Sequence, residues 1–404
     1  MQTVPDPIEL DTILTQQVRR VFAIDDLTWE GKDSLVRYHG HLTMDSQVAY
    51  DMLAAALRPY NVTPLFRISQ GRETIILISG AIQPQASNLW VNVVMFLLTL
   101  LSVLFAGGLY GYQGDLPGNS GMGWGRFILT ALRTGLPFAI SMLAILLAHE
   151  FGHYLAGRYH KTHVTLPYFI PFPFSPFGTM GAFIQMKEPP KNRRVLLDIG
   201  MAGPLAGLLV AVPVLFIGLR LSTLDTLPHL ITRNTAFSLE GNSLLYLLAK
   251  FAVFRQWLPA PHSYNGLAPL TYWLRYFFTG QPLPLGGQDV LLHPVAWAGW
   301  AGLLVTALNL IPAGQLDGGH ALYVLLGKQV DRIRPLILAI LFVLGLVWNG
   351  WWLWAFLILI FGGTHAEPLD QITPLDGRRR VLAILGLVVF VLVFTPVPLI
   401  LVGA

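Results

Sequence analysis

Residues 143–153 read LAILLAHEFGH, six apolar positions followed by a glutamate between two histidines. On a helix, His149 and His153 lie one turn apart on the same face, where two imidazoles can bind one zinc ion and Glu150 can act on a bound water. Ionisable groups in an apolar helix are costly unless they are paired, bound to metal or facing a polar cavity. The stretch therefore predicts a metal site inside a hydrophobic helix. The alternative is a structural polar cluster between helices.

The composition is that of a membrane protein. Of 404 residues, 54% are hydrophobic and 12% are charged, whereas about a quarter of the residues of ordinary soluble proteins are charged. The net charge is only +4 and the basic residues cluster beside apolar segments, which favours topology signals over a nucleic-acid-binding face. We expect a lipid bilayer as surroundings and no nucleic acid as partner. Because the chain contains no cysteine, a metal site must use histidines and carboxylates.

The apolar segments predict an α-helical polytopic membrane protein. Crossing about 30 Å of hydrocarbon takes roughly 20 residues. Spans are expected at 89–112, 134–158, 195–219, 294–312 and 380–402, and over 335–363 as one long helix or two. Two helices would put the basic run 378–380 on the cytoplasmic side, as the positive-inside tendency prefers. We therefore predict seven spans, with six as the alternative.

The remaining segments divide the chain into a soluble head (residues 1–83) of small α+β type, a linker (84–88) and a membrane-embedded domain (89–404). Within that domain, residues 220–290 predict an extramembrane or re-entrant insertion. The head is expected to contain strands at 35–42, 63–68 and 73–79 and a helix at 44–57; the insertion is expected to contain an amphipathic or re-entrant helix at 244–258. The polar start of the chain lacks the features of a signal peptide. We therefore expect a multi-pass protein of a prokaryotic plasma membrane with its head in the cytoplasm.

Two histidines leave a tetrahedral zinc site incomplete, so a third protein ligand is needed. Residues 309–320 read NLIPAGQLDGGH, in which Pro312 breaks the preceding apolar helix and Gly318 allows close packing. Asp317 is the expected third ligand. The alternatives are that Asp317 only caps a helix beginning at the next residue, and that His320 is the ligand instead.

HEFGH in an apolar helix with NLIPAGQLDGGH far downstream resembles the site-2 protease family of zinc intramembrane metalloproteases, in particular its cyanobacterial and chloroplast branch. GTMGAFI at 178–184 and AGPLAG at 202–207 also match, and the resemblance covers roughly residues 90–365. For the site, the resemblance implies one zinc ion bound by His149, His153 and Asp317, Glu150 as the catalytic acid/base, and Asn309 as a further active-site residue.

The resemblance implies a zinc-dependent intramembrane metalloendopeptidase that hydrolyses peptide bonds of membrane-spanning protein substrates, with Glu150 activating a zinc-bound water. The amide of Asn309 could donate to the oxyanion or could only make a helix-terminal hydrogen bond. The alternative functions are a membrane metal carrier or transporter that uses the same His/Asp cluster, and a silent scaffold, which the presence of Glu150 disfavours. The oligomeric state stays open.

Prolines between residues 163 and 186 exclude a continuous helix there, and residues 179–186 have strand character. At membrane depth such backbone is tolerated only where it lines a cavity or is covered by protein. We predict a membrane-embedded β-hairpin whose edge pairs with the substrate as an extended strand. The alternative is an aromatic loop at the lipid interface. His160, His163 and His365 have no partner at ligand spacing and are expected to be interfacial, whereas Gly203 and Gly207 are typical of helix packing.

Overall fold

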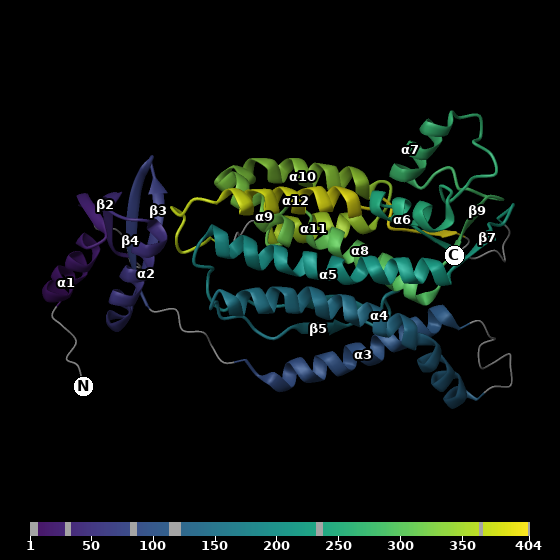
Figure 1. Ribbon diagram of the computed structural model, residues 1–404, viewed down its shortest axis with the longest axis horizontal. Coiled ribbons are helices and arrows are strands. Elements are labelled where there is room, and N and C mark those ends of the chain that lie inside the picture. Colours follow the sequence, from purple (N-terminus) through teal and green to yellow (C-terminus); the bar gives the residue numbers. More distant parts are fainter. Residues whose placement is uncertain are drawn as a thin grey trace.

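In the computed structural model the molecule is elongated, with the head at one end, a bundle of helices in the middle and a mixed region of short helices and strands at the other end (Figure 1). The structure describes residues 7–28, 34–80, 87–112, 123–231, 237–362 and 367–402. Residues 84–86 of the predicted linker lie outside these ranges.

The head contains a four-stranded antiparallel sheet in the order β1-β2-β4-β3, covered by two helices. The elements are α1 (Pro7–Arg19), β1 (Phe22–Thr28), β2 (Ser34–Leu42), α2 (Ser46–Leu57), the short 3-10 helix η1 (Arg58–Tyr60), β3 (Val62–Ser69) and β4 (Arg72–Ser79). Fully buried side chains such as Tyr38, Phe66 and Ile75 form a hydrophobic core of its own. The predicted α+β arrangement is present. The sequence reading missed α1 and β1, because the polar and acidic composition of residues 1–34 hid their few apolar positions.

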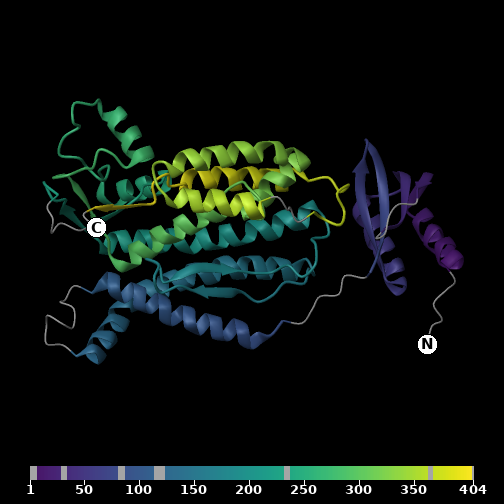
Figure 2. The same cartoon turned by 180° about the vertical axis from the view of Figure 1, so that it is seen from behind.

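The body is a bundle of helices that run along the long axis of the molecule (Figures 1 and 2). These are α3 (Leu89–Gly111), α4 (Trp124–Tyr159), α5 (Arg193–Leu221), α8 (Pro294–Asn309), α9 (Asp317–Leu326), α10 (Val330–Gly345), α11 (Gly350–Phe361) and α12 (Gly377–Val393), with the 3-10 helix η2 (Gly327–Gln329) between α9 and α10. Within the described ranges, three helices are long and apolar enough to cross a membrane, namely α3, α4 and α5. Helices α8, α10, α11 and α12 have 16, 16, 12 and 17 residues, fewer than the roughly 20 needed for a full span. The body is therefore mostly helical as predicted, whereas six to seven spans stay a prediction.

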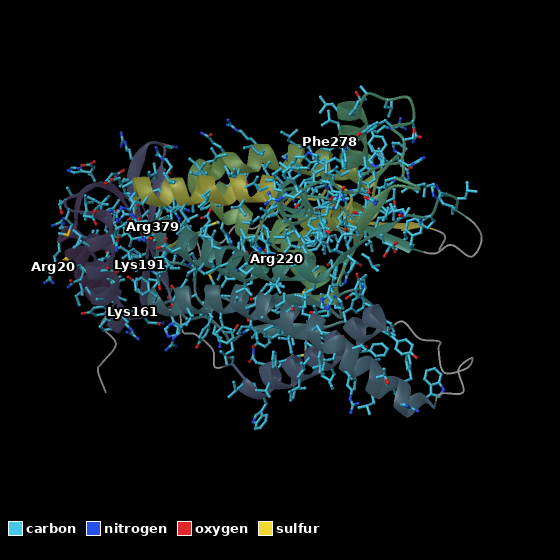
Figure 3. The ribbon with its side chains drawn as sticks, turned by 45° about the vertical axis from the view of Figure 1, so that its right-hand side comes forward. Arg20, Lys161, Lys191, Arg220, Phe278 and Arg379 are labelled. Atoms are coloured by element: carbon cyan, nitrogen blue, oxygen red, sulfur yellow. The ribbon has the colours of Figure 1, made fainter. Side chains whose placement is uncertain are left out.

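The apolar stretch 335–363 forms two helices, α10 and α11, which are separated by a break at residues 346–349. This hairpin returns the chain to the end of the body beside the head, where α12 begins. Figure 3 shows Lys161, Lys191 and Arg379 at that same end. The two-helix alternative for this stretch is therefore confirmed.

The span expected at 380–402 is wrong in its second half. Helix α12 ends at Val393, because Pro396 and Pro398 follow and proline has no amide hydrogen to continue a helix. The chain then forms β10 (Leu399–Val402), which pairs with β8 (Phe237–Glu240). The rest of the insertion comprises β7 (Thr223–Thr226), α6 (Leu244–Phe254), α7 (Pro269–Thr279) and β9 (Gln288–Leu291), so the helix expected at 244–258 is shorter than predicted.

A β-hairpin is present where the prolines exclude a helix. Its strands are β5 (Tyr168–Pro171) and β6 (Thr179–Phe183), and it lies along α3 (Figure 2). Buried polar side chains of α3 satisfy its backbone: Asn92 Nδ2 donates to the carbonyl oxygens of Leu166 and Pro167, both at 2.9 Å, and Ser102 donates to Gly178. Backbone that leaves regular structure in an apolar helical body needs such partners.

The head is joined to the body through a short segment, residues 369–371, that precedes α12. On one side, the amide of Phe66 in β3 donates to Leu369 O at 2.9 Å, and the amide of Gln371 donates back to Phe66 O at 3.0 Å. On the other side, the amides of Leu369 and Asp370 donate to the carbonyl oxygens of residues 190 and 191 at 3.0 and 2.8 Å. The segment therefore extends the sheet of the head to the chain that leads from β6 into α5.

Candidate metal centre

Small residues bring the histidine helix α4 against α5. A Cβ atom on Gly152 would lie 2.5 Å from the carbonyl oxygen of Ala202, and one on Gly203 would overlap the ring of His153. At Gly207, a Cβ atom would lie 3.1 Å from His149 Cβ. The absence of these Cβ atoms lets α5 pack directly on the two imidazoles, so Gly203 and Gly207 act in helix packing as predicted.

Three ligand atoms converge at this contact. His149 Nε2 lies 3.2 Å from His153 Nε2, and Asp317 Oδ2 lies 3.6 Å from His149 Nε2 and 3.3 Å from His153 Nε2. Within the parts of the chain that the structure describes, this is the one group of three or more His, Cys, Asp or Glu side chains that could hold a metal ion. Ligand distances of 2.0–2.1 Å in a tetrahedral zinc site put ligand atoms about 3.3 Å apart. The observed spacing therefore fits zinc, with three protein ligands and a fourth position for water or substrate.

The tautomer of His153 is set by the backbone of α5. Its Nδ1 lies 2.7 Å from the carbonyl oxygen of Ile199. A carbonyl oxygen only accepts, so Nδ1 carries the hydrogen and the lone pair of Nε2 faces the metal group. This is the usual arrangement of a histidine ligand with an outer hydrogen-bond partner.

Asp317 reaches the histidines because the chain turns sharply after α8. Pro312 lies in this turn and Gly314 has a left-handed φ of +60°, which favours glycine. At Gly318, a Cβ atom would overlap the carbonyl oxygen of Leu310. Asp317 is the first residue of α9, whose N-cap is Leu316, so its carboxylate does not serve as the N-cap. The side chain is instead placed beside the two imidazoles.

Glu150 follows the first histidine and is buried, with 3% of its surface exposed. Among the described residues, its Oε2 atom has no hydrogen-bond partner. A buried carboxylate oxygen without a partner is costly, and functional sites are where such a cost is commonly found. Glu150 is thus placed to exchange a proton with a water or with a substrate group beside the metal position.

Asn309 and His320 lie at the same place. Asn309, the last residue of α8, has its Nδ2 atom 3.1 Å from His149 Nε2. His320 lines the same cavity but is not a member of the metal-binding group, which disfavours it as the third ligand.

The metal group lines a cavity of about 880 Å³. Its wall includes β6 and the chain that follows it, residues 182–190, together with Glu150, Asn309 and Gln315. Glu367, two residues before the segment 369–371 that joins the head, also lines it. A cavity of this volume is within the usual range of ligand-binding pockets in proteins.

The sequence reading missed partners that are distant along the chain. His160 Nε2 lies 2.9 Å from Asp198 Oδ2, and His163 Nδ1 lies 3.0 Å from Glu188 Oε1. Spacing along the chain carries no signal for such contacts. The first depends on how α4 packs on α5, and the second on how residues 163–165 pair with residues 185–187. His365 lies outside the described residues.

Comparison with known proteins identifies relatives of this chain. The sequence model of peptidase family M50 matches residues 137–348. A probable zinc metalloprotease EGY1, chloroplastic, of Arabidopsis thaliana is 32% identical over 65% of this chain and 43% of its own length. EGY1 of Oryza sativa subsp. japonica is 30% identical over 78% of this chain and 52% of its own length, and EGY2 of Arabidopsis thaliana is 30% identical over 67% and 43%. The chain thus spans about half the length of these curated relatives. No solved structure gave a significant match.

These relatives confirm the resemblance to the site-2 protease family and its chloroplast branch. They also correct one expectation. Their names place them in the chloroplast, so the expected prokaryotic plasma membrane is wrong. With the family match covering more than half of its residues, the chain belongs to peptidase family M50.

Proposed function

We propose that the protein is a zinc-dependent metalloendopeptidase that hydrolyses peptide bonds of membrane-spanning protein substrates. The observation that carries this proposal is the convergence of His149, His153 and Asp317 beside the buried Glu150 at the wall of a large cavity. Membership of a peptidase family and the zinc metalloprotease names of the relatives support it.

In this proposal His149, His153 and Asp317 hold one zinc ion, which supplies Lewis-acid polarisation of a water and of the peptide carbonyl. Glu150 accepts a proton from the attacking water and donates it to the departing amine. Its burial beside the ligand group suits this role, as does its Oε2 atom, which has no hydrogen-bond partner in the described parts of the chain. The amide of Asn309, next to His149, donates a hydrogen bond to the developing oxyanion.

We further propose that the substrate enters as an extended strand against the edge of the hairpin, along residues 184–186 that follow β6. Gln185 O accepts from the amide of Thr165, and the amide of Lys187 donates to His163 O, at 3.0 and 2.9 Å. In an antiparallel ladder, the groups of alternate residues point to opposite edges. The amides and carbonyls of Ile184 and Met186 therefore face away from the partner strand, and both residues line the cavity. This edge offers the backbone partners that an unwound helix requires.

Changing Glu150 to Gln tests the proposal. Glutamine keeps the size of the side chain but cannot take up the proton, so we expect zinc to stay bound at one ion per chain and cleavage of a transmembrane peptide to fall by about 10²-fold or more. The control is Glu73→Gln in the head. Glutamine keeps a side-chain oxygen there that can still accept the hydrogen bond from the amide of Leu42. Undiminished cleavage by the Glu150 variant with zinc bound would refute the proposal. A metal carrier that used the same ligands would move zinc across vesicles in both forms.

The division into a head (1–83), a linker (84–88) and a membrane domain (89–404) is part of the same proposal. The separate hydrophobic core of the head supports it. In this arrangement the head, fixed beside the cavity by residues 369–371, sorts substrates or stabilises the catalytic end of the body.

A further inference from the structure

A network of charged side chains ties together three helices of the body at the end beside the head. Arg379, in the first turn of α12, makes two parallel hydrogen bonds to Asp198 of α5, with Nε to Oδ1 at 2.8 Å and Nη2 to Oδ2 at 2.5 Å. His160, at the C-terminal end of α4, lies 2.9 Å from the same carboxylate. A two-pronged arginine–carboxylate pair fixes distance and orientation together.

Asp198 precedes Ile199, the residue whose backbone carbonyl contacts the proposed metal ligand His153. The carbonyl oxygen of the next residue, Ile199, accepts the Nδ1 hydrogen of His153 at 2.7 Å. His160, the C-cap residue of α4, lies seven residues after His153, which is two helical turns, so both project from one face toward α5. Helix α4 is therefore tied to α5 twice, through consecutive residues of α5.

The network is only partly exposed, with 17% of the His160 side chain, 19% of Asp198 and 31% of Arg379 accessible. Arg379 also contacts Asp376, the N-cap residue of its own helix, at 2.6 Å. Asp376 shares the arginine with Asp198 but lies on α12, away from the carbonyl that holds His153. Asp198 lies on the helix that carries the partner of the metal ligand and also contacts His160, whereas Asp376 caps α12 and lies 4.0 Å from Arg194 Nε.

We propose that Asp198 is a positioning residue for the metal centre. Held by Arg379 and His160, it fixes the height and rotation of α5 so that Ile199 O receives the Nδ1 hydrogen of His153 and Nε2 stays directed at the zinc position. This role rests on the proposed zinc site. Loss of outer partners of a histidine ligand commonly lowers metal affinity or activity by about 10- to 100-fold.

The test measures the Zn²⁺ affinity of the full-length protein by competition with a chelator, together with the visible spectrum of the Co²⁺-loaded form. Asp198→Asn is expected to lower zinc affinity by about 10- to 100-fold and to alter the cobalt spectrum. Asp376→Asn, the matched control, should leave both unchanged, because asparagine still caps the helix. Arg379→Lys, which keeps the charge but loses the two-pronged geometry, should give an intermediate loss.

The outcomes separate a positioning role from a structural one. If Asp198→Asn lowers only the midpoint of thermal unfolding while zinc affinity and cobalt spectrum match the wild type, the inference is overturned. Should that variant fail to fold, unchanged zinc affinity in Arg379→Lys overturns it instead. A wild-type protein that binds zinc but cleaves no transmembrane peptide would refute the proposed function and leave this test intact.

Discussion

The imidazole of His153 lies directly against Gly203 of α5, at a position where any Cβ atom would overlap its Nε2 atom. The glycine therefore sets how closely α5 approaches the metal-binding helix. Because Ile199 O on the same helix accepts the hydrogen of the opposite ring nitrogen, α5 both leaves room for the ring and orients it.

Changing Gly203 to Ala should push the His153 ring from its place and lower zinc affinity by about 10-fold or more. Gly207→Ala is the comparison, since its Cβ atom would lie at 3.1 Å from His149 Cβ, a contact that a small shift relieves. Chelator competition in detergent measures both affinities. Equal affinities of the Gly203 variant and the wild type would show that α5 does not set the ligand geometry.

Changing Ile184 to Pro should abolish cleavage of a transmembrane peptide while zinc stays bound. Proline removes the amide hydrogen that faces the cavity edge of the strand, so a substrate strand loses one backbone partner. Ile184→Val, which keeps the amide, is the control and should cleave at a rate close to that of the wild type. The measurement is the cleavage rate with zinc content determined on the same samples. A proline variant that cleaves normally would count against strand addition.

Changing Arg67 to Ala should loosen the head from the body. Arg67 Nη1 donates to the carbonyl oxygens of Phe66, Pro368 and Leu369 at 2.9–3.0 Å, and 16% of the side chain is exposed. Phe66 O and Leu369 O keep their backbone donors, the amides of Gln371 and Phe66, whereas the buried Pro368 O loses the donor that Arg67 supplies. A buried carbonyl left without a donor costs about 1–3 kcal/mol. We expect a lower midpoint of thermal unfolding and faster limited proteolysis between the two parts, neither of which should occur in Arg72→Ala, an exposed position. Identical proteolysis patterns of both variants would rule out this role.

Stability should depend on Glu240, at the far end of the body. Burial, followed by the nearby Asp289 carboxylate, raises the pKa of Glu240 to about 7, against the opposing effect of Lys250. The native state therefore binds a proton more tightly than the unfolded chain, so the free energy of unfolding falls as pH rises from about 4.5 to about 7. Each pKa unit is worth about 1.4 kcal/mol.

Glu240→Gln should remove this fall in the free energy of unfolding. The stability of the variant relative to the wild type should therefore be higher at pH 8 than at pH 5. Its amide oxygen can still accept from the Tyr246 hydroxyl, which is 2.8 Å from Glu240 Oε1. Asp225→Asn, an exposed change on β7, serves as the control. The measurement is the midpoint of thermal unfolding at the two pH values. A Gln variant that keeps the full pH dependence of the wild type would contradict the raised pKa of Glu240.

Much of the fold could be predicted because membrane helices are local features. A run such as 89–111 forms its own backbone hydrogen bonds whatever its neighbours are, and prolines mark where helices stop. The errors fell where local signals compete: α12 was extended past Pro396, and β1 was missed in a polar stretch. The number of spans stays a prediction because helices of 12–17 residues lie below the length of a full span.

The sequence by itself determined the ligand types of the site. Helical spacing alone puts His149 and His153 on one face, and the absence of cysteine leaves a carboxylate such as Asp317 or a third histidine such as His320 to complete the predicted set. Only the tertiary structure decided which groups support them. The carbonyl of Ile199 and the carboxylate of Asp198 come from α5. Their contacts with α4 depend on how closely the two helices pack at their glycines. The spacing of residues along one helix does not encode that packing.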